Sequence, residues 1–222
     1  MRPDRAGRTP LPGTCVAAQR MKESHDEELR EDTVNEQFPL PVPVAAKAVA
    51  RCVGTTAGLL VNRRIRMPRT RVGMRLHFGD GTTAAVYRET VIREAASRTP
   101  CVLVVEFRLR VVRRQWAHAL FRRGSLLNTP LFAGFPGFVS KLWLAHDEHG
   151  VYRGLYEWDG ADRAEAYARA LWRVLALVSV HGSIHYRVLP GLARDDVLEE
   201  PRILGETTVD DHADWWRLVA IG

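Results

Sequence analysis

The run GFPGFVSKLWLAHDEHGVYRGLYEWDGADRAEAYARALWRV, residues 134–174, decides the fold of this chain. Residues 138–145 and 151–158 have the composition of strands, and the short polar segment between them, which ends in glycine, predicts an antiparallel hairpin. Asp159 is placed to cap a helix, because apolar residues then recur at helical spacing as far as Val178. The run therefore predicts two strands and a helix in direct succession.

The flanking sequence extends this pattern on both sides. Residues 101–110 alternate as a strand does, residues 115–132 have a helical stripe that Gly124 and Pro130 interrupt, and residues 183–189 supply a last strand. The order strand, helix, strand, strand, helix, strand predicts an α+β fold, a ferredoxin-like βαββαβ antiparallel sheet with both helices on one face. The other face then needs a cover. A second subunit would supply it, so we expect a homodimer that forms a dimeric α/β barrel.

The remaining sequence divides into four parts. Residues 1–43 are rich in proline and charge and predict a disordered leader. Residues 44–70 predict a short docking helix and a basic linker. The domain itself is expected over 71–190, including an N-terminal hairpin at 71–92 that extends the sheet edge or covers a pocket, and 191–222 form a C-terminal tail.

Composition narrows the class of protein. The formal net charge is +6, but the basic residues are mixed with acidic ones along the chain, which does not indicate a nucleic-acid partner. Cys15, Cys52 and Cys101 form no CxxC pair and are odd in number, which predicts a reducing, cytoplasmic setting. No apolar run approaches the ~20 residues of a transmembrane helix. The alternative for residues 44–71 is a helix on a membrane surface.

Several short motifs in the central run carry a family resemblance: Pro136-Gly137-Phe138, Lys141-Leu142-Trp143, Gly154-Leu155-Tyr156 and the helix start at residues 162–167. Over about residues 101–190 the chain resembles the YdhR-type monooxygenase family of the dimeric α/β-barrel superfamily. The resemblance implies oxygenation of an aromatic or polyketide-like small molecule without a cofactor. It also leaves about 100 residues ahead of the core that the compact family pattern lacks.

Alternation along the strands predicts one polar face lining a cavity. On it, His185 or Glu157 would deprotonate the substrate, and Trp143 would stack on it. Basic side chains would stabilise the enolate. The other predicted substrate-binding residues are Arg108, Lys141, Arg153, Glu106 and Arg187. The alternative is that these charges form cross-strand and intersubunit ion pairs.

Neither a metal nor a cofactor is expected. His181 and His185 have a spacing that suits ligation on a helix, but a glycine turn separates them. Haem would need a helical histidine, and His118 lies in the interrupted helix. Phosphate-loop motifs are absent from the sequence. The alternative function is a non-catalytic homodimeric ligand-binding or structural protein of the same fold.

Overall fold

The computed structural model describes residues 39–93, 97–110, 129, 131–205 and 214–222, and every structural statement below refers to these. The helices are α2 (Val42–Val61), α4 (Ala161–Val178), α5 (Arg194–Glu199) and the 3-10 helix η3 (Pro201–Leu204). The strands are β1 (Ile65–Arg66), β2 (Arg75–Phe78), β3 (Thr83–Ile92), β4 (Pro100–Arg108), β5 (Phe138–Leu144), β6 (Val151–Asp159), β7 (His185–Pro190) and β8 (Leu218–Ile221).

Two predictions fall largely outside the described residues. The leader over 1–43 is described only from residue 39, and the helix predicted over 115–132 is described only at 129, 131 and 132.

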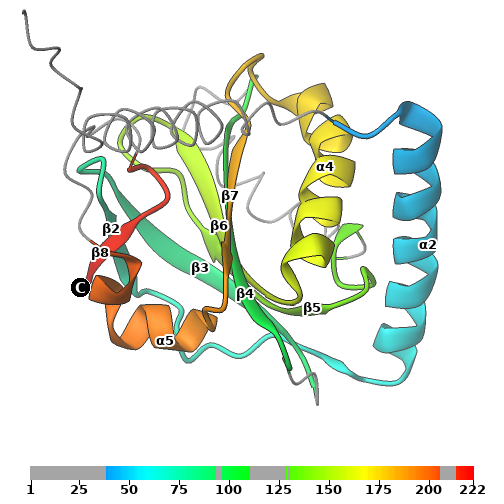
Figure 1. Ribbon diagram of the computed structural model, residues 1–222, viewed down its shortest axis with the longest axis horizontal. Helices are drawn as coiled ribbons and strands as arrows, with labels where there is room; N and C mark the ends of the chain where they lie inside the picture. Colours follow the sequence, from blue (N-terminus) through cyan, green and yellow to red (C-terminus); the bar gives the residue numbers. More distant parts are fainter. Residues whose placement is uncertain (1–38, 94–96, 111–128, 130, 206–213) are drawn as a thin grey trace, which may run out of the picture. The chain divides into compact units, whose positions relative to one another are not determined.

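The strands form one curled antiparallel sheet (Figure 1). Its order is β7-β4-β6-β5-β3-β2-β8, with β1 paired to β3. β2 and β3 pair with each other, and β3 also pairs with β5, so β3 lies inside the sheet. The predicted α+β class with an antiparallel sheet is confirmed.

The two faces of the sheet carry separate apolar clusters. On one face, Leu103 packs with Tyr167 of α4. On the opposite face, Val104 packs with Leu76 of β2 and Leu218 of β8, and α5 adds two further side chains. Within Pro39–Gly222, this chain therefore covers for itself the face for which a second subunit was expected. That reason for a homodimer does not hold, and the homodimer stays a prediction.

The start of α4 differs from the prediction. Gly160 is the N-cap, with a φ of 106° that glycine adopts without strain, and no side chain caps the helix. The Asp159 carboxylate instead accepts hydrogen bonds from the backbone N–H groups of Thr99 and Arg98, at 3.0 and 2.8 Å. These bonds lower the pKa of Asp159 to about 2. Asp159 thus fastens the start of β4 to the end of β6 and leaves the cap position to glycine.

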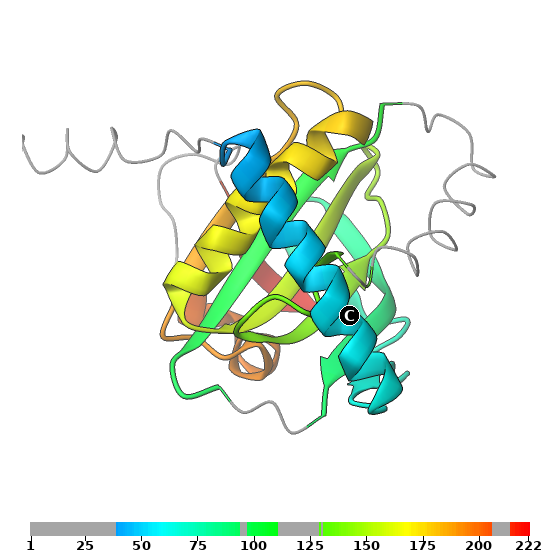
Figure 2. The ribbon, with the colours of Figure 1, turned by 90° about the vertical axis from the view of Figure 1, so that its right-hand side faces the viewer.

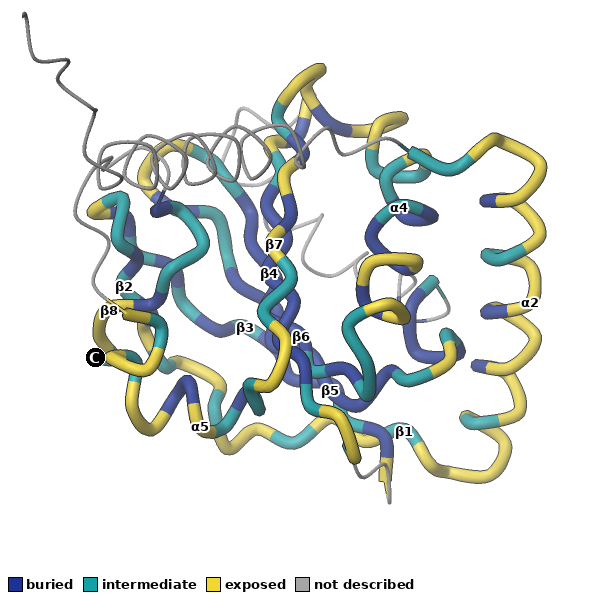
Figure 3. The backbone as a smooth tube through the Cα atoms, in the orientation of Figure 1, coloured by how far each residue is buried: buried dark blue, intermediate teal, exposed yellow. Residues whose placement is uncertain are grey.

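The helix α2 lies over α4 (Figure 2). It buries a narrow stripe that includes Ala45, Cys52 and Thr56. Gly134 makes the close approach possible, because a Cβ there would overlap the backbone oxygen of Cys52 and lie 2.7 Å from the hydroxyl of Thr56. The rest of α2 is mostly exposed (Figure 3).

The length and composition of α2 overturn one expectation. The helix has 20 residues and a mean hydropathy of 1.4, enough to cross a membrane by length and composition, and only 17% of its apolar window is buried. The prediction that no apolar run approaches this length is wrong, because threonines and glycines interspersed among the alanines, valines and leucines conceal the run. A core helix of a soluble protein or a signal sequence can have the same composition.

Candidate active site

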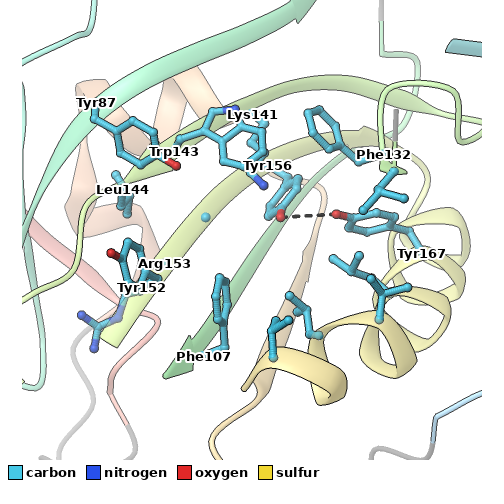
Figure 4. Close-up of a pocket in the computed structure, with 16 residues that line it drawn as sticks. Tyr87, Phe107, Phe132, Lys141, Trp143, Leu144, Tyr152, Arg153, Tyr156 and Tyr167 are labelled. Atoms are coloured by element: carbon cyan, nitrogen blue, oxygen red, sulfur yellow. Dashed lines mark hydrogen bonds between the residues drawn. The ribbon is translucent and has the colours of Figure 1, made fainter. Parts of the chain in front are cut away.

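A cavity of about 180 Å³ lies between the sheet and α4 (Figure 4). An engineered cavity of about 150 Å³ in another protein holds benzene, so the space here suits a compound of roughly one aromatic ring. The walls come from β3, β4, β5, β6, α4 and the segment before β5, and they are mainly aromatic. The aromatic lining residues are Tyr87, Phe107, Phe132, Trp143, Tyr152, Tyr156 and Tyr167.

Lys141 brings an amine to this aromatic cavity. The residue lies in the middle of β5 and is 7% exposed. Its Nζ lies 3.3 Å from the ring centre of Trp143, 4.5 Å from that of Tyr156 and 4.8 Å from that of Phe132. Among the described residues, Nζ has neither a hydrogen bond nor an ion pair. Its neighbours are aromatic rings.

The surroundings of Lys141 favour the neutral amine. Burial lowers its pKa well below the ordinary value, and the nearby positive charge of Arg88 lowers it further. Aromatic faces attract a cation by about 2 kcal/mol or more at a desolvated site, but they supply no full negative charge. Removing an ammonium group from water costs several kcal/mol unless an anion compensates it. We therefore expect desolvation to outweigh the cation–π attraction.

Trp143 is held in place by its neighbours. Its Nε1–H donates a 3.1 Å hydrogen bond to the hydroxyl of Thr90. The guanidinium carbon of Arg88 lies 3.7 Å from the indole centre, close to the distance of Lys141 Nζ. The Arg88 guanidinium and the Lys141 amine thus already lie against the indole ring, which argues against the predicted stacking of Trp143 on a substrate. Sequence reasoning did not find Arg88, because only the pairing of β3 with β5 places it opposite Trp143.

Two tyrosine hydroxyls meet beside the amine. The hydroxyl of Tyr167 donates to that of Tyr156 at 3.3 Å, from α4 to β6 (Figure 4). Burial raises the pKa of both phenols, so both keep their protons at neutral pH. Because Tyr156 accepts this bond, its own proton is available to a molecule in the cavity.

The predicted single polar face is wrong. Lys141 pairs with Tyr156 and Trp143 with Gly154, so both side chains lie on the α4 face of the sheet. The predicted bases, His185 and Glu157, do not line the cavity. Alternation correctly separated the two sets of residues within each strand. It could not show which residues of neighbouring strands lie on the same face of the sheet, because the pairing register between the strands decides that.

An ion-pair network instead surrounds Arg153 on the other face. Its guanidinium contacts Asp80 at 2.6 Å, Asp147 at 2.8 Å and Glu106 at 3.2 Å. Glu106 also lies 3.0 Å from Nδ1 of His185, whose side chain is half exposed. In Figure 4 the guanidinium points away from Lys141. Cross-strand ion pairs, the alternative to a polar cavity, therefore engage these predicted site residues.

Glu157 belongs to a second polar cluster on the same face. It accepts a 3.3 Å hydrogen bond from Ser140, and burial raises its pKa. Glu89, one strand further along the sheet, is fully buried and pairs with Arg71 at 3.0 Å and Arg194 at 3.1 Å. This cluster fastens β3 to the segments that cover the face.

The last two predicted binding residues lie apart from the cavity. Arg108 is exposed at the end of β4, and Arg187 places its guanidinium 5.2 Å from the ring of Trp216. Within the described part of the chain, no three His, Cys, Asp or Glu residues are grouped to hold a metal ion.

No family model matches the sequence, and no curated protein matches it. Among solved structures, the chain is similar to an uncharacterized ferredoxin-fold protein related to antibiotic biosynthesis monooxygenases from Listeria monocytogenes. The identity is 14% and the TM-score 0.35, over 50% of this chain and 66% of that one. The chain is also similar to a monooxygenase-like protein from Listeria innocua, with 14% identity and a TM-score of 0.35, over 50% of this chain and 65% of that one. A third similar structure is that of a major regulator of staphylococcal pathogenesis, with 13% identity and a TM-score of 0.36, over 63% of this chain and 93% of that one.

This chain thus spans just under two thirds of each Listeria protein. At these TM-scores the likenesses establish no common family, and the YdhR-type relationship stays a prediction.

Proposed function

We propose that the protein is a small-molecule oxygenase that works without a cofactor, and that its substrate lies in the aromatic cavity between the sheet and α4. One observation carries the proposal: Lys141 presents an amine, free of hydrogen bonds and ion pairs among the described residues, inside that cavity. A neutral amine is a general base, whereas an ordinary surface lysine is protonated at pH 7. Lys141 thus takes the role that the sequence assigned to His185 or Glu157.

The chemistry follows from the groups around the amine. Lys141 removes a proton from a carbon flanked by carbonyl or aryl groups, and the resulting ammonium, with Arg88 nearby, stabilises the carbanion. The carbanion gives electrons to dioxygen. A methylene group becomes a carbonyl, one oxygen atom stays in the product, and the other leaves as water. The substrate is the reductant, so the balance requires no flavin, haem or metal.

The size of the cavity limits the substrate. At about 180 Å³ it accepts a compound of roughly one ring, which is smaller than the usual ligand pocket of about 300 Å³ or more. We therefore place the substrate among short 1,3-dicarbonyl compounds and one-ring aryl compounds that carry an activated methylene group, and not among multi-ring polyketides.

Oxygen consumption tests the proposal. Full-length protein is given short 1,3-diketones and one-ring aryl ketones with an activated methylene group in an oxygen electrode, as wild type, Lys141→Met and His185→Ala. We expect turnover in wild type and His185→Ala and its loss in Lys141→Met. Activity that survives in Lys141→Met and disappears in His185→Ala would overturn the assignment of the base.

The runner-up is a non-catalytic binder, which the largely apolar wall of the cavity favours. Calorimetry with the same compounds separates the two functions. Saturable binding without oxygen consumption in wild type would support the binder and refute the oxygenase.

The homodimer belongs to the same proposal. What supports it is the outward face of α2, where Val42, Val53, Leu60 and Val61 are exposed. Light scattering on the full chain tests it, and the mass of a single chain at micromolar concentration would refute it.

A further inference from the structure

We propose that Lys141 is also a nucleophile, and that its amine forms an imine with small uncharged aldehydes or ketones that enter the aromatic cavity. This activity goes beyond the proposed oxygenation, since it uses the same cavity but needs no dioxygen and no acidic C–H bond.

The position of the amine suits carbonyl addition. Nζ lies within 3.3 to 4.8 Å of the ring centres of Trp143, Tyr156 and Phe132, and no described carboxylate holds it as a salt bridge. A lysine in an apolar pocket, or beside another cation, is a recognised way to activate an amine as a nucleophile. Lys141 has both features, because Arg88 lies on the same indole ring.

The reaction balances with the groups present. The Nζ lone pair attacks the carbonyl carbon, the C–N bond forms, and one N–H proton moves to the carbonyl oxygen to give a carbinolamine. The hydroxyl group then leaves as water with a proton from Tyr156, the C=N bond forms, and the second N–H proton returns to the tyrosine. Tyr156 is placed for this because Tyr167 donates to its oxygen, which leaves its own proton free. No oxidant or reductant is consumed.

The cavity also selects the carbonyl compound. Its lining is mostly apolar and its volume is about 180 Å³, so it favours a neutral compound of about one ring and disfavours a charged keto acid or a sugar. Water released by imine formation leaves an apolar space, which favours the condensed product over the free amine.

Reductive trapping with benzaldehyde tests the inference, and the composition of the chain makes the test clean. Lys22, Lys47 and Lys141 are its only lysines, so the N-terminal amine is the one other site. Full-length protein is incubated with benzaldehyde and sodium cyanoborohydride at pH 7, and peptide mass mapping locates the benzyl group. At this pH an exposed lysine is almost wholly protonated and reacts slowly.

We expect one benzyl group on Lys141, added at least about tenfold faster than on Lys47, at a rate that saturates with benzaldehyde. Lys141→Met should abolish the fast adduct, and Lys47→Arg should leave it unchanged. Tyr156→Phe keeps the amine and should slow trapping several-fold, which tests the proposal even if Lys141→Met does not fold. Labelling of Lys141 no faster than of Lys47, or labelling that never saturates, would overturn the inference.

The outcome is separable from that of the proposed function. Oxygen consumption without an adduct on Lys141 refutes the imine and leaves the oxygenase standing. A saturable adduct without oxygen consumption supports the imine and refutes the oxygenase.

Discussion

Replacing Lys141 with methionine should stabilise the fold at neutral pH, and the gain should shrink as the pH rises. Methionine has nearly the same length and volume and no charge. In the folded protein the pKa of Lys141 lies well below 10.5, because burial and Arg88 disfavour the ammonium. In the unfolded chain it is about 10.4. Between these two pKa values, the unfolded state of the wild type binds one proton more than the folded state.

This difference fixes the sign and the size of the effect. The wild type gains about 1.4 kcal/mol of unfolding free energy for each pH unit across that window, because rising pH penalises the state that binds the proton. Lys141→Met lacks the titrating amine, so its unfolding free energy does not rise with pH through this group. The advantage of the variant should therefore fall by about 1.4 kcal/mol per pH unit up to about pH 10 and then level off.

Urea unfolding of both proteins at each pH from 7 to 11 measures the effect. Other titrating groups are common to both and cancel in the difference. Lys47→Met is the matched control, since Lys47 is exposed on α2 and its difference from wild type should stay flat with pH. A flat difference for Lys141→Met as well would show that Lys141 is charged in the folded state, and both proposals for the cavity would fail.

Three further substitutions test the framework around the site. Arg153→Met should cost about 3–5 kcal/mol by urea unfolding at pH 7, because three carboxylates lose their shared cation. A neutral result would contradict the network. Gly134→Ala should cost about 1–3 kcal/mol by urea unfolding, since the alanine methyl group would overlap the backbone oxygen of Cys52. A neutral result would mean that α2 does not pack against residue 134. Thr90→Val removes the hydroxyl that accepts the hydrogen bond of the Trp143 indole N–H and should cost about 1 kcal/mol of unfolding free energy. A change near zero would show that this hydrogen bond does not hold the indole ring.

The central hairpin and helix could be read from local sequence. Residues 138–145 and 151–158 became β5 and β6, and the helical spacing after Asp159 became α4, because alternation and periodicity are properties of adjacent residues. Asp159 itself was misjudged. Whether a carboxylate caps the next helix or accepts from Arg98 and Thr99 depends on a segment some 60 residues away.

The sequence by itself determined the α+β class, the strands and helix of residues 134–174, and the division of each strand into two alternating sets. Only the tertiary structure decided which sets share a face, because pairing register brings Lys141 beside Tyr156, and Arg88 beside Trp143. It also decided that β2, β8 and α5 cover the second face from within the chain. A cavity depends on residues that are distant in sequence, and for this reason the amine of Lys141 could be named as a candidate from the sequence, while its role as the base could not.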